Sequence, residues 1–505
     1  MIGRRRSLNG AARELELLVE RPLISVVMPT HDTDPGHLRE AIGSVRSQSY
    51  PNWELVIADD GSSREDTRRA LSRAVSRDAR VTARLLERNQ GISAATNAAL
   101  ELCRGELVAF LDHDDTMAPD ALLRVAQAFA EHGADVVYTD QDKLTPGGRR
   151  ADPFLKPGFS PVYALGAMYV GHLLVARREL IDEAGRLDPA YDTIQDFELL
   201  LRLSERTDRI GHVPEVLYHW RAIPGSIALG VDQKPGVTDL QARAVNAHLA
   251  RRGIEAEAVP HPIVPHRLRL RPTGRHERAE VSVVTIPSGE RPASVGNRGA
   301  GRSESEYLLF IDEDVEVTDP DGVEELLVCA RLPGVGAVGP TLIHPDGRVS
   351  AAGFAIGLDD PAAPVMRGFD AGADGYYGAL ACAREVSAVG VGCLLVSRAN
   401  FDRVGGFEEA YSRQFADLDL CMKLREAGLS VICSPAPRAV DRTTLARRRS
   451  DFDVLDRALF VDRWYERLAA GDPFYGRGLS REAADYALPP FGVDSLEVTM
   501  RESAR

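Results

Sequence analysis

The chain contains the same stretch of sequence twice, and this repeat restricts the possible folds more than any other feature. The stretch "GELVAFLDHDDTMAPDALL" begins at residue 105 and matches "SEYLLFIDEDVEVTDPDGVEELL", which begins at residue 305. Further along, "HLLVARRELIDEAGRLDPAYDTIQDFELLLRLSE" matches "CLLVSRANFDRVGGFEEAYSRQFADLDLCMKLRE". The repeat predicts two copies of one domain rather than two unrelated domains.

Each copy has the pattern of an α/β domain. The stretches 23–30 ("LISVVMPT"), 53–60 ("WELVIADD") and 106–112 ("ELVAFLD") are short, rich in β-branched residues and apolar on both faces, and stretches of helical spacing separate them. Short strands alternating with helices predict βαβ units around a mostly parallel sheet. Polar residues follow each strand, and ligands of such sheets bind at the carboxyl ends of the strands. We therefore expect one site at that edge.

The segment between the copies, "RRGIEAEAVPHPIVPHRLRLRPTGRHERAE", is rich in proline and charge, as is typical of a linker. The expected organisation is an N-terminal tail or helix at 1–20, a first domain at 21–250, a linker at 251–279, a second domain at 280–445 and a C-terminal helical extension at 446–505.

The two copies differ in length. Pro29 precedes Asp112 by 83 residues, whereas Pro287 precedes Asp312 by 25, so about 58 residues are missing from the second copy. The missing part is the helix–strand–helix segment that carries "ADDGS" in the first copy. Although Asp312, Asp314 and Asp417 remain, we expect the second copy to be truncated and degenerate.

Composition excludes several classes of protein. The 505 residues carry a net charge of −14, which argues against a broad nucleic-acid interface. The sequence contains no window of about 18 uncharged apolar residues, so we expect no membrane span. The six cysteines form no CxxC pair, as expected for buried, reduced thiols of a cytoplasmic protein. Residues 4–6, three arginines, fit either a solvated terminus or a peripheral contact with acidic lipid at the inner face of the cell membrane.

Three carboxylates stand together at the end of the third strand, at Asp112, Asp114 and Asp115. Carboxylates in a D-x-D arrangement suit a hard divalent cation, Mg²⁺ or Mn²⁺, which also binds substrate phosphates. The alternative is that these acids cap the N-terminus of the following helix. For Asp115 taken alone, metal binding and helix capping are equally consistent with the sequence. For Asp60 in "ADDGS", the alternative to a role in binding is a purely structural turn. Gly91 in "NQGISAATNAAL" precedes a helix N-terminus that can face a phosphate.

Taken in order, these motifs resemble a known family. "SVVMPTHDTDPGHLREAIGSVRSQSYPNWELVIADDGSS", "NQGISAATNAAL", "FLDHDD", "QDFELLLR" and "VPEVLYHWR" are similar to the family-2 nucleotide-sugar glycosyltransferases of GT-A fold, over residues 21–230. The second copy, with "AVGVGCLLVSR", "ADLDLC" and "RWYERLAAGDPFYG", resembles the C-terminal domain of tandem members of rhamnosyl- or O-antigen type, over residues 280–480.

The resemblance implies roles for individual residues. Nucleotide-sugar binding falls on the set Pro29, Thr30, His31, Asp60, Asn89, Gly91 and Asp112. In that set, Thr30 and His31 line the nucleobase pocket, Asp60 bonds the base, and Asp112 holds the ribose or the metal. The family usually has an aromatic–Asn pair where this chain has His31 and Asp32, and an imidazole can also stack on a base.

The resemblance also implies the reacting groups. Asp114 and His219 would bind the metal, and Asp196 would be the general base that deprotonates the acceptor hydroxyl. Glu198 is the alternative base, and the repeat keeps an acid at both positions, as Asp417 and Asp419.

The resulting prediction is an inverting, metal-dependent glycosyltransferase that uses Mn²⁺ or Mg²⁺ and is active in its first domain. Its partners would be a nucleotide-sugar donor and a glycan or lipid-linked acceptor, with no nucleic acid. The competing interpretation is a non-catalytic carbohydrate-binding or scaffold protein in which both domains are degenerate. No oligomeric state follows from the sequence.

Overall fold

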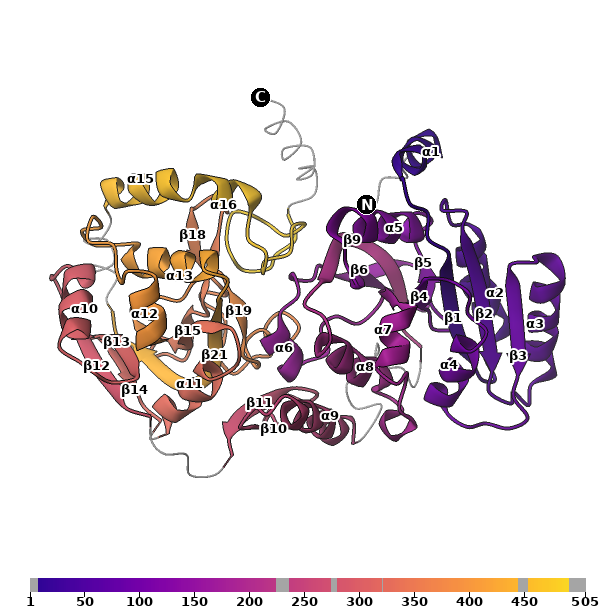
Figure 1. Ribbon diagram of the computed structural model, residues 1–505, viewed down its shortest axis with the longest axis horizontal. Coiled ribbons are helices and arrows are strands. Elements are labelled where there is room, and N and C mark those ends of the chain that lie inside the picture. The colour runs from indigo at the N-terminus through magenta and orange to yellow at the C-terminus, as the bar shows by residue number, and fades with distance from the viewer. Residues whose placement is uncertain (1–7, 224–235, 274–278, 320, 444–452, 490–505) are drawn as a thin grey trace. The chain divides into compact units, whose positions relative to one another are not determined.

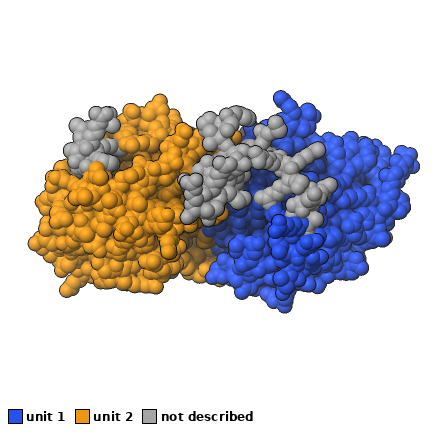
Figure 2. Space-filling model, turned by 90° about the horizontal axis from the view of Figure 1, so that it is seen from above, with its two compact units in different colours: residues 1–159, 168–248 blue, residues 160–167, 249–505 orange. Residues whose placement is uncertain are grey.

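The computed structural model describes residues 8–223, 236–273, 279–319, 321–443 and 453–489. The chain divides into two compact units, coloured separately in Figure 2. Unit 1 consists of residues 1–159 and 168–248, and unit 2 of residues 160–167 and 249–505. Residues 160–167 therefore belong to unit 2, although the segments on both sides of them belong to unit 1.

Unit 1 begins with a helix and then alternates strands and helices (Figure 1). Its elements are α1 (Leu8–Leu17), β1 (Ile24–Thr30), α2 (Pro35–Arg46), β2 (Trp53–Asp59), α3 (Glu65–Arg77), β3 (Val81–Leu85), α4 (Ile92–Leu100), β4 (Leu107–Phe110), β5 (Thr116–Met117), α5 (Ala121–His132), β6 (Val136–Leu144), β7 (Arg150–Phe154), β8 (Leu174–Arg177), α7 (Arg178–Glu183), the 3₁₀ helix η1 (Pro189–Tyr191), α8 (Gln195–Ser204), β9 (Ile210–Arg221) and most of α9 (Val237–Arg251).

One mixed sheet forms the centre of unit 1, in the order β3-β2-β1-β4-β8-β6-β9-β5, and β7 pairs with β6. Strands β3, β2, β1 and β4 run parallel, as do β6 and β9. Every residue of β1 and β2 is buried. Alternate residues of β1 (Ile24, Val26 and Met28) join the core that α2, α3 and α5 complete, while α4 contacts β1 and β2. Burial on both faces explains the continuous apolar runs in these strands.

Unit 2 is built around a second mixed sheet. Its elements are α6 (Pro161–Gly166), β10 (Ala256–Pro260), β11 (Leu268–Pro272), β12 (Val281–Ile286), α10 (Pro292–Gly301), β13 (Tyr307–Asp312), β14 (Val315–Val317), α11 (Gly322–Ala330), β15 (Val335–Ile343), β16 (Val349–Ala351), β17 (Phe354–Ile356), β18 (Ala362–Pro364), β19 (Arg384–Val386), β20 (Cys393–Ser397), α12 (Arg398–Arg403), α13 (Ala416–Glu426), β21 (Ser430–Asp441), α15 (Val454–Arg463) and α16 (Tyr465–Ala470). The stretch predicted as a linker includes the antiparallel hairpin β10–β11.

The two sheets follow the same path. In unit 1 the path is β1-β4-β8-β6-β9-β5, and in unit 2 it is β12-β13-β20-β15-β21-β14. The predicted α/β fold with a truncated second copy is therefore confirmed. The truncation is larger in structural terms than expected, because both β2 and β3 lack a counterpart, so two strands are missing rather than one.

Strand pairing also aligns β9 with β21, residue by residue. His219 of β9 pairs with Thr116 of β5, whereas in unit 2 Val440 pairs with Glu316 and Asp441 with Val315. Thr116 and Glu316 are equivalent in the repeat, so Val440 occupies the place of His219. Asp441 lies one residue further along the strand.

Two expectations from composition can be compared with the structure. All six cysteines are free and buried. Among the described residues, no helix combines the length and the apolar character that crossing a membrane requires.

Candidate active site

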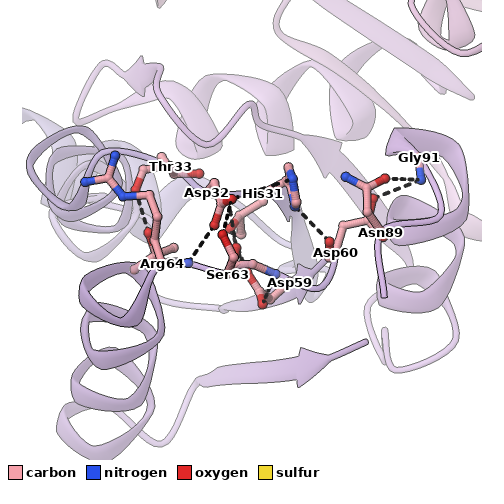
Figure 3. Close-up of polar contacts among 12 residues, drawn as sticks. His31, Asp32, Thr33, Asp59, Asp60, Ser63, Arg64, Asn89 and Gly91 are labelled. Atoms are coloured by element: carbon pink, nitrogen blue, oxygen red, sulfur yellow. Dashed lines mark hydrogen bonds and ion pairs between the residues drawn. The ribbon is translucent and has the colours of Figure 1, made fainter. Parts of the chain in front are cut away.

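The carboxyl ends of β1 and β2 meet in a network of polar side chains (Figure 3). Asp59 accepts hydrogen bonds from the Ser62 amide at 3.1 Å and the Ser62 hydroxyl at 2.5 Å. Asp32 accepts from the Arg64 amide and the Ser63 hydroxyl, both at 2.8 Å. These bonds lower the pKa of Asp32, chiefly the bond from the Arg64 amide. The carboxylates of Asp32 and Asp59 therefore hold in place the loops that follow β1 and β2.

Thr30 and His31 lie where the sequence placed them, beside the end of β2. Thr30 is buried, opposite Asp59, and Pro29 precedes it as a buried residue of β1. The Nδ1 atom of His31 lies 2.8 Å from the carbonyl oxygen of Asp60. A carbonyl can only accept, so Nδ1 carries a proton, and Nε2 lies 3.9 Å from Oδ2 of Asp32. The His31 side chain is 42% exposed.

Asp60, Asn89 and Gly91 form one hydrogen-bonded group (Figure 3). The buried Asp60 carboxylate accepts from the Gln90 amide at 2.8 Å and the Gly91 amide at 2.9 Å. The Asn89 side-chain oxygen also accepts from the Gly91 amide, at 3.2 Å. Asp60 thus shapes the loop before α4, and each of its oxygens keeps further acceptor capacity for a base.

The N-terminus of α4 carries an acid from another part of the chain. Gly91 has φ +96°, and a Cβ there would lie 2.0 Å from an Asp192 carboxylate oxygen. The Ser93 amide donates to the other Asp192 oxygen at 3.1 Å. The helix end that the sequence suggested for a phosphate is therefore capped by Asp192. Glycine is required at 91 both for the positive φ and for this close approach.

The three acids after β4 have different surroundings. Asp115 is fully buried and accepts from the Tyr218 hydroxyl at 2.6 Å and the Arg221 amide at 2.7 Å. Burial and the charges of Asp112 and Asp114 raise its pKa well above the usual range. Asp115 is not a helix N-cap, because β5 separates it from α5. Its role is to tie the acidic loop to β9.

Asp112 and Asp114 keep their carboxylates available. The side chain of Asp112 is 36% exposed, and His172 Nε2 lies 3.6 Å from its Oδ2 atom. Burial raises the pKa of Asp114, His113 opposes the rise, and the charge of Asp112 adds to it. Two neighbouring carboxylates of this kind are stabilised when a cation binds between them.

His219 is held by an acid that the sequence analysis did not select. Its Nδ1 atom lies 2.6 Å from Oδ1 of Asp142, a buried residue of β6, and Arg150 donates to the other Asp142 oxygen. Because the carboxylate accepts, the proton sits on Nδ1, and Nε2 is the nitrogen left for a ligand. Only the pairing of β6 with β9, which sets Asp142 opposite His219, reveals this contact.

Asp196 is the better candidate for the base. It lies in the first turn of α8, where one oxygen accepts from the Phe197 amide at 2.9 Å. Burial raises the pKa of Asp196, His172 opposes the rise, and Asp112 adds to it, so all three belong to one electrostatic group. Glu198 is buried with both oxygens on Arg202, at 2.7 and 2.5 Å. That ion pair leaves Glu198 a structural role.

The residues present fit a divalent cation only in part. Among the described residues, no three His, Cys, Asp or Glu side chains are grouped as metal ligands. The carboxylates of Asp112 and Asp114 still suit a Mg²⁺-like ion, because such an ion usually takes one or two carboxylates and completes its shell with substrate phosphates and water.

The corresponding positions in unit 2 keep the acids but not the His219–Asp142 pair. Asp312 accepts from the Asp314 amide at 2.9 Å. Asp417, the counterpart of Asp196, accepts from the Val391 amide at 2.7 Å, and burial raises its pKa. Val440 and, by its pairing with β21, Ile343 stand where unit 1 has His219 and Asp142.

Comparison with known proteins identifies relatives for both halves of the chain. Residues 25–172 match the family described as "Glycosyl transferase family 2". The putative teichuronic acid biosynthesis glycosyltransferase TuaG of Bacillus subtilis is 31% identical, over 41% of this chain and 82% of its own length. The O-antigen biosynthesis protein RfbC of Myxococcus xanthus is 32% identical over 98% of this chain.

These relatives differ in how much of their length is matched. The chain spans 43% of RfbC and 60% of an uncharacterized protein, y4gI, of Sinorhizobium fredii that is 34% identical. Among solved structures, S. aureus TarS 1–349 is 19% identical, covering 45% of this chain and 72% of its own, with a TM-score of 0.35.

Proposed function

This chain belongs to glycosyl transferase family 2, and from that premise we propose that unit 1 is an inverting, metal-dependent glycosyltransferase. Its donor is a nucleotide-diphosphate sugar, and its acceptor is a glycan or a lipid-linked glycan. The observation that carries the proposal is the approach of His172 Nε2 to Asp112, at 3.6 Å, in surroundings where both residues also shift the pKa of Asp196. This arrangement supports a donor carboxylate and a base in one site.

The donor would bind along the carboxyl ends of β1, β2 and β4. His31 offers a ring face to the nucleobase, and Asp60 offers acceptor atoms for its edge. Asp112 would hold the ribose or the metal. Asp114 and His219 Nε2, with Asp112, would hold Mn²⁺ or Mg²⁺. When bound, such an ion neutralises the charge that develops on the departing diphosphate.

Asp196 would supply the other half of the reaction. An acceptor hydroxyl is a weak nucleophile until its proton begins to leave, so a carboxylate must accept that proton as the oxygen attacks the anomeric carbon. Attack from the face opposite the diphosphate inverts the configuration. Because Glu198 is occupied by Arg202, Asp196 is the acid free for this task.

A second function concerns unit 2 alone. With Val440 and Ile343 in place of the His219–Asp142 pair, unit 2 fits a non-catalytic role in binding glycan or supporting unit 1.

The proposal is tested with UDP-, GDP- and dTDP-sugars. We expect the full chain to hydrolyse at least one of them slowly in the presence of Mn²⁺, and to stop when the ion is chelated. Asp114→Asn should abolish this hydrolysis, whereas Asp314→Asn, the matched change in unit 2, should not. Equal loss in both variants, or hydrolysis that is indifferent to chelation, would refute the proposed site.

A further inference from the structure

The loop 170–172 that enters the site is held by two buried polar side chains. The His172 amide donates to the Gln141 side-chain oxygen at 3.1 Å, and the His172 carbonyl accepts from Lys156 Nζ at 2.6 Å. The same Nζ donates to the Val170 carbonyl and to Gln141. Lys156 is 1% exposed and Gln141 7%. Burying an ammonium and an amide is costly unless both are fully bonded, so this arrangement holds the backbone on both sides of His172.

The ring of His172 is fixed as firmly as its backbone. It stacks on Tyr218 with ring centroids 4.8 Å apart and meets the edge of Trp220 at 6.3 Å. Its Nε2 atom lies 3.6 Å from Asp112 Oδ2, in the loop after β4. In the first turn of α8, burial raises the pKa of Asp196, His172 lowers it and Asp112 raises it. His172 therefore acts on two acids that come from different elements.

Unit 2 contains the same loop without the polar groups. A Cβ on Gly171 would lie 2.7 Å from the Gln141 side-chain oxygen, and a Cβ on Gly392 would lie 2.9 Å from Leu342 Cδ1. In both units the glycine therefore lies against one side chain of the neighbouring strand, and Leu342 occupies in unit 2 the position that Gln141 has in unit 1. The repeat then sets Cys393, which is buried, at the place of His172. The loop therefore folds with apolar partners, and the fold alone does not require Gln141 and His172.

We propose that His172 is a positioning residue of the transferase site, which holds the Asp112 and Asp196 carboxylates in their reactive arrangement and is itself fixed by Gln141 and Lys156. The inference rests on the proposed function, in which Asp112 binds the donor and Asp196 is the base. It predicts that His172 affects turnover rather than donor affinity.

The test compares His172→Ala, His172→Gln and the matched variant Cys393→Ala of unit 2 in the full chain. Hydrolysis of the best of the three nucleotide sugars gives kcat and KM, and calorimetry gives the Kd of the corresponding nucleoside diphosphate. We expect His172→Ala to lower kcat about 10²-fold, the usual effect of a misplaced reacting group, with Kd little changed. His172→Gln, which keeps an N–H donor, should recover part of the loss, and Cys393→Ala should match the unsubstituted chain.

Two results would overturn the proposal. One is an unchanged kcat in His172→Ala. The other is a fall in nucleotide affinity that parallels the fall in kcat, since His172 would then bind the donor. A chain that turns over no nucleotide sugar would refute the proposed function instead.

The positioning of His172 can be tested without turnover. Gln141→Leu copies the residue of unit 2, so the loop should still fold, but the His172 amide loses its acceptor. Hydrogen exchange should then be faster at residues 170–172 and unchanged in β1. Protection equal to that of the unsubstituted chain would overturn the role of Gln141 and, with it, the proposal.

Discussion

Asp112, Asp114 and Asp115 stand almost side by side in the sequence, yet the structure gives them separate tasks. Asp115 is fully buried and bonded to the Tyr218 hydroxyl and the Arg221 amide. Its neighbours keep free oxygens, and Asp114 carries a raised pKa from burial and from the charge of Asp112. Like charges held together in a protein raise the free energy of the empty site. A bound cation removes this cost, so the repulsion is a reason for metal binding.

Asp114→Asn tests this argument directly. The substitution removes one negative charge, so we expect the melting temperature of the protein without ligand to stay equal or rise. The stabilisation by Mn²⁺ together with a nucleoside diphosphate should disappear. Thermal denaturation with and without these ligands measures both effects, and Asp314→Asn serves as the control. Full Mn²⁺-dependent stabilisation in Asp114→Asn would show that the carboxylate does not bind the ion.

Asp196→Asn tests the base. A general base contributes about 10²–10⁴-fold to turnover, so kcat should fall by that factor while nucleotide affinity changes little. Because burial raises the pKa of Asp196, the unsubstituted enzyme should lose activity as the pH falls, beginning at a higher pH than an ordinary aspartate would give. Asp417→Asn is the matched control and should leave the rate unchanged. A parallel loss of affinity and rate in Asp196→Asn would indicate a structural role.

The sequence predicted the residues that follow strands but not their supports. Thr30, Asp60, Asp112 and Asp114 could be selected because strands that alternate with helices bring their carboxyl ends together. The contact between Asp142 and His219 spans 77 residues and depends on the register of β6 against β9. Strand order and register follow from packing of the whole sheet, which no local pattern contains.

At the scale of elements, the repeat predicted the shared path of the two sheets, and the structure adds what the shorter copy lacks. The length deficit suggested one missing strand, but both β2 and β3 have no counterpart, so β12 ends the sheet where β1 pairs with β2. Length alone could not distinguish one strand from two, because helices and loops share the same 58 residues. Short elements were missed for a related reason: β5 has two residues, too few for a periodic pattern.

Helix α6 offers a prediction about how an element is anchored within unit 2. The buried Glu385 carboxylate of β19 accepts from the Val162 amide at 3.0 Å and the Tyr163 amide at 3.4 Å. Burial raises the pKa of Glu385 to about 7 from an ordinary value of 4.5. Between pH 4.5 and about 7, the folded state therefore keeps a proton on Glu385 that the unfolded state has released. The resulting stabilisation is complete below the lower value and is lost as the pH rises through about 7.

We expect the contribution of Glu385 to the free energy of unfolding to fall as the pH rises from 4.5 to about 7. Glu385→Gln cannot titrate, so this fall should be absent in the variant. Denaturant unfolding at a series of pH values measures the difference between the two proteins. A difference that is constant with pH would contradict a titration of Glu385 in this range.

At the scale of the whole molecule, the two units are two copies of one fold. The residues that differ between them indicate which parts the proposed transferase site needs. Both keep the strand path, and both keep acids at 112/312 and 196/417. Unit 2 lacks β2 with its Asp60, and it has Val440, Ile343 and Cys393 where unit 1 has His219, Asp142 and His172. Under the proposed function, the differences at the β2 segment, at His219 and at Asp142 all concern donor binding.

The full chain should accordingly bind one nucleoside diphosphate. Asp60, the proposed acceptor for a base edge, belongs to the segment that unit 2 lacks, and Val440 stands at the position of His219. Calorimetry with the preferred nucleoside diphosphate and Mn²⁺ should give a stoichiometry of one per chain. Asp114→Asn should remove that binding, and Asp314→Asn should preserve it. A stoichiometry of two that Asp314→Asn reduces to one would show that the second sheet binds nucleotide without the missing strands.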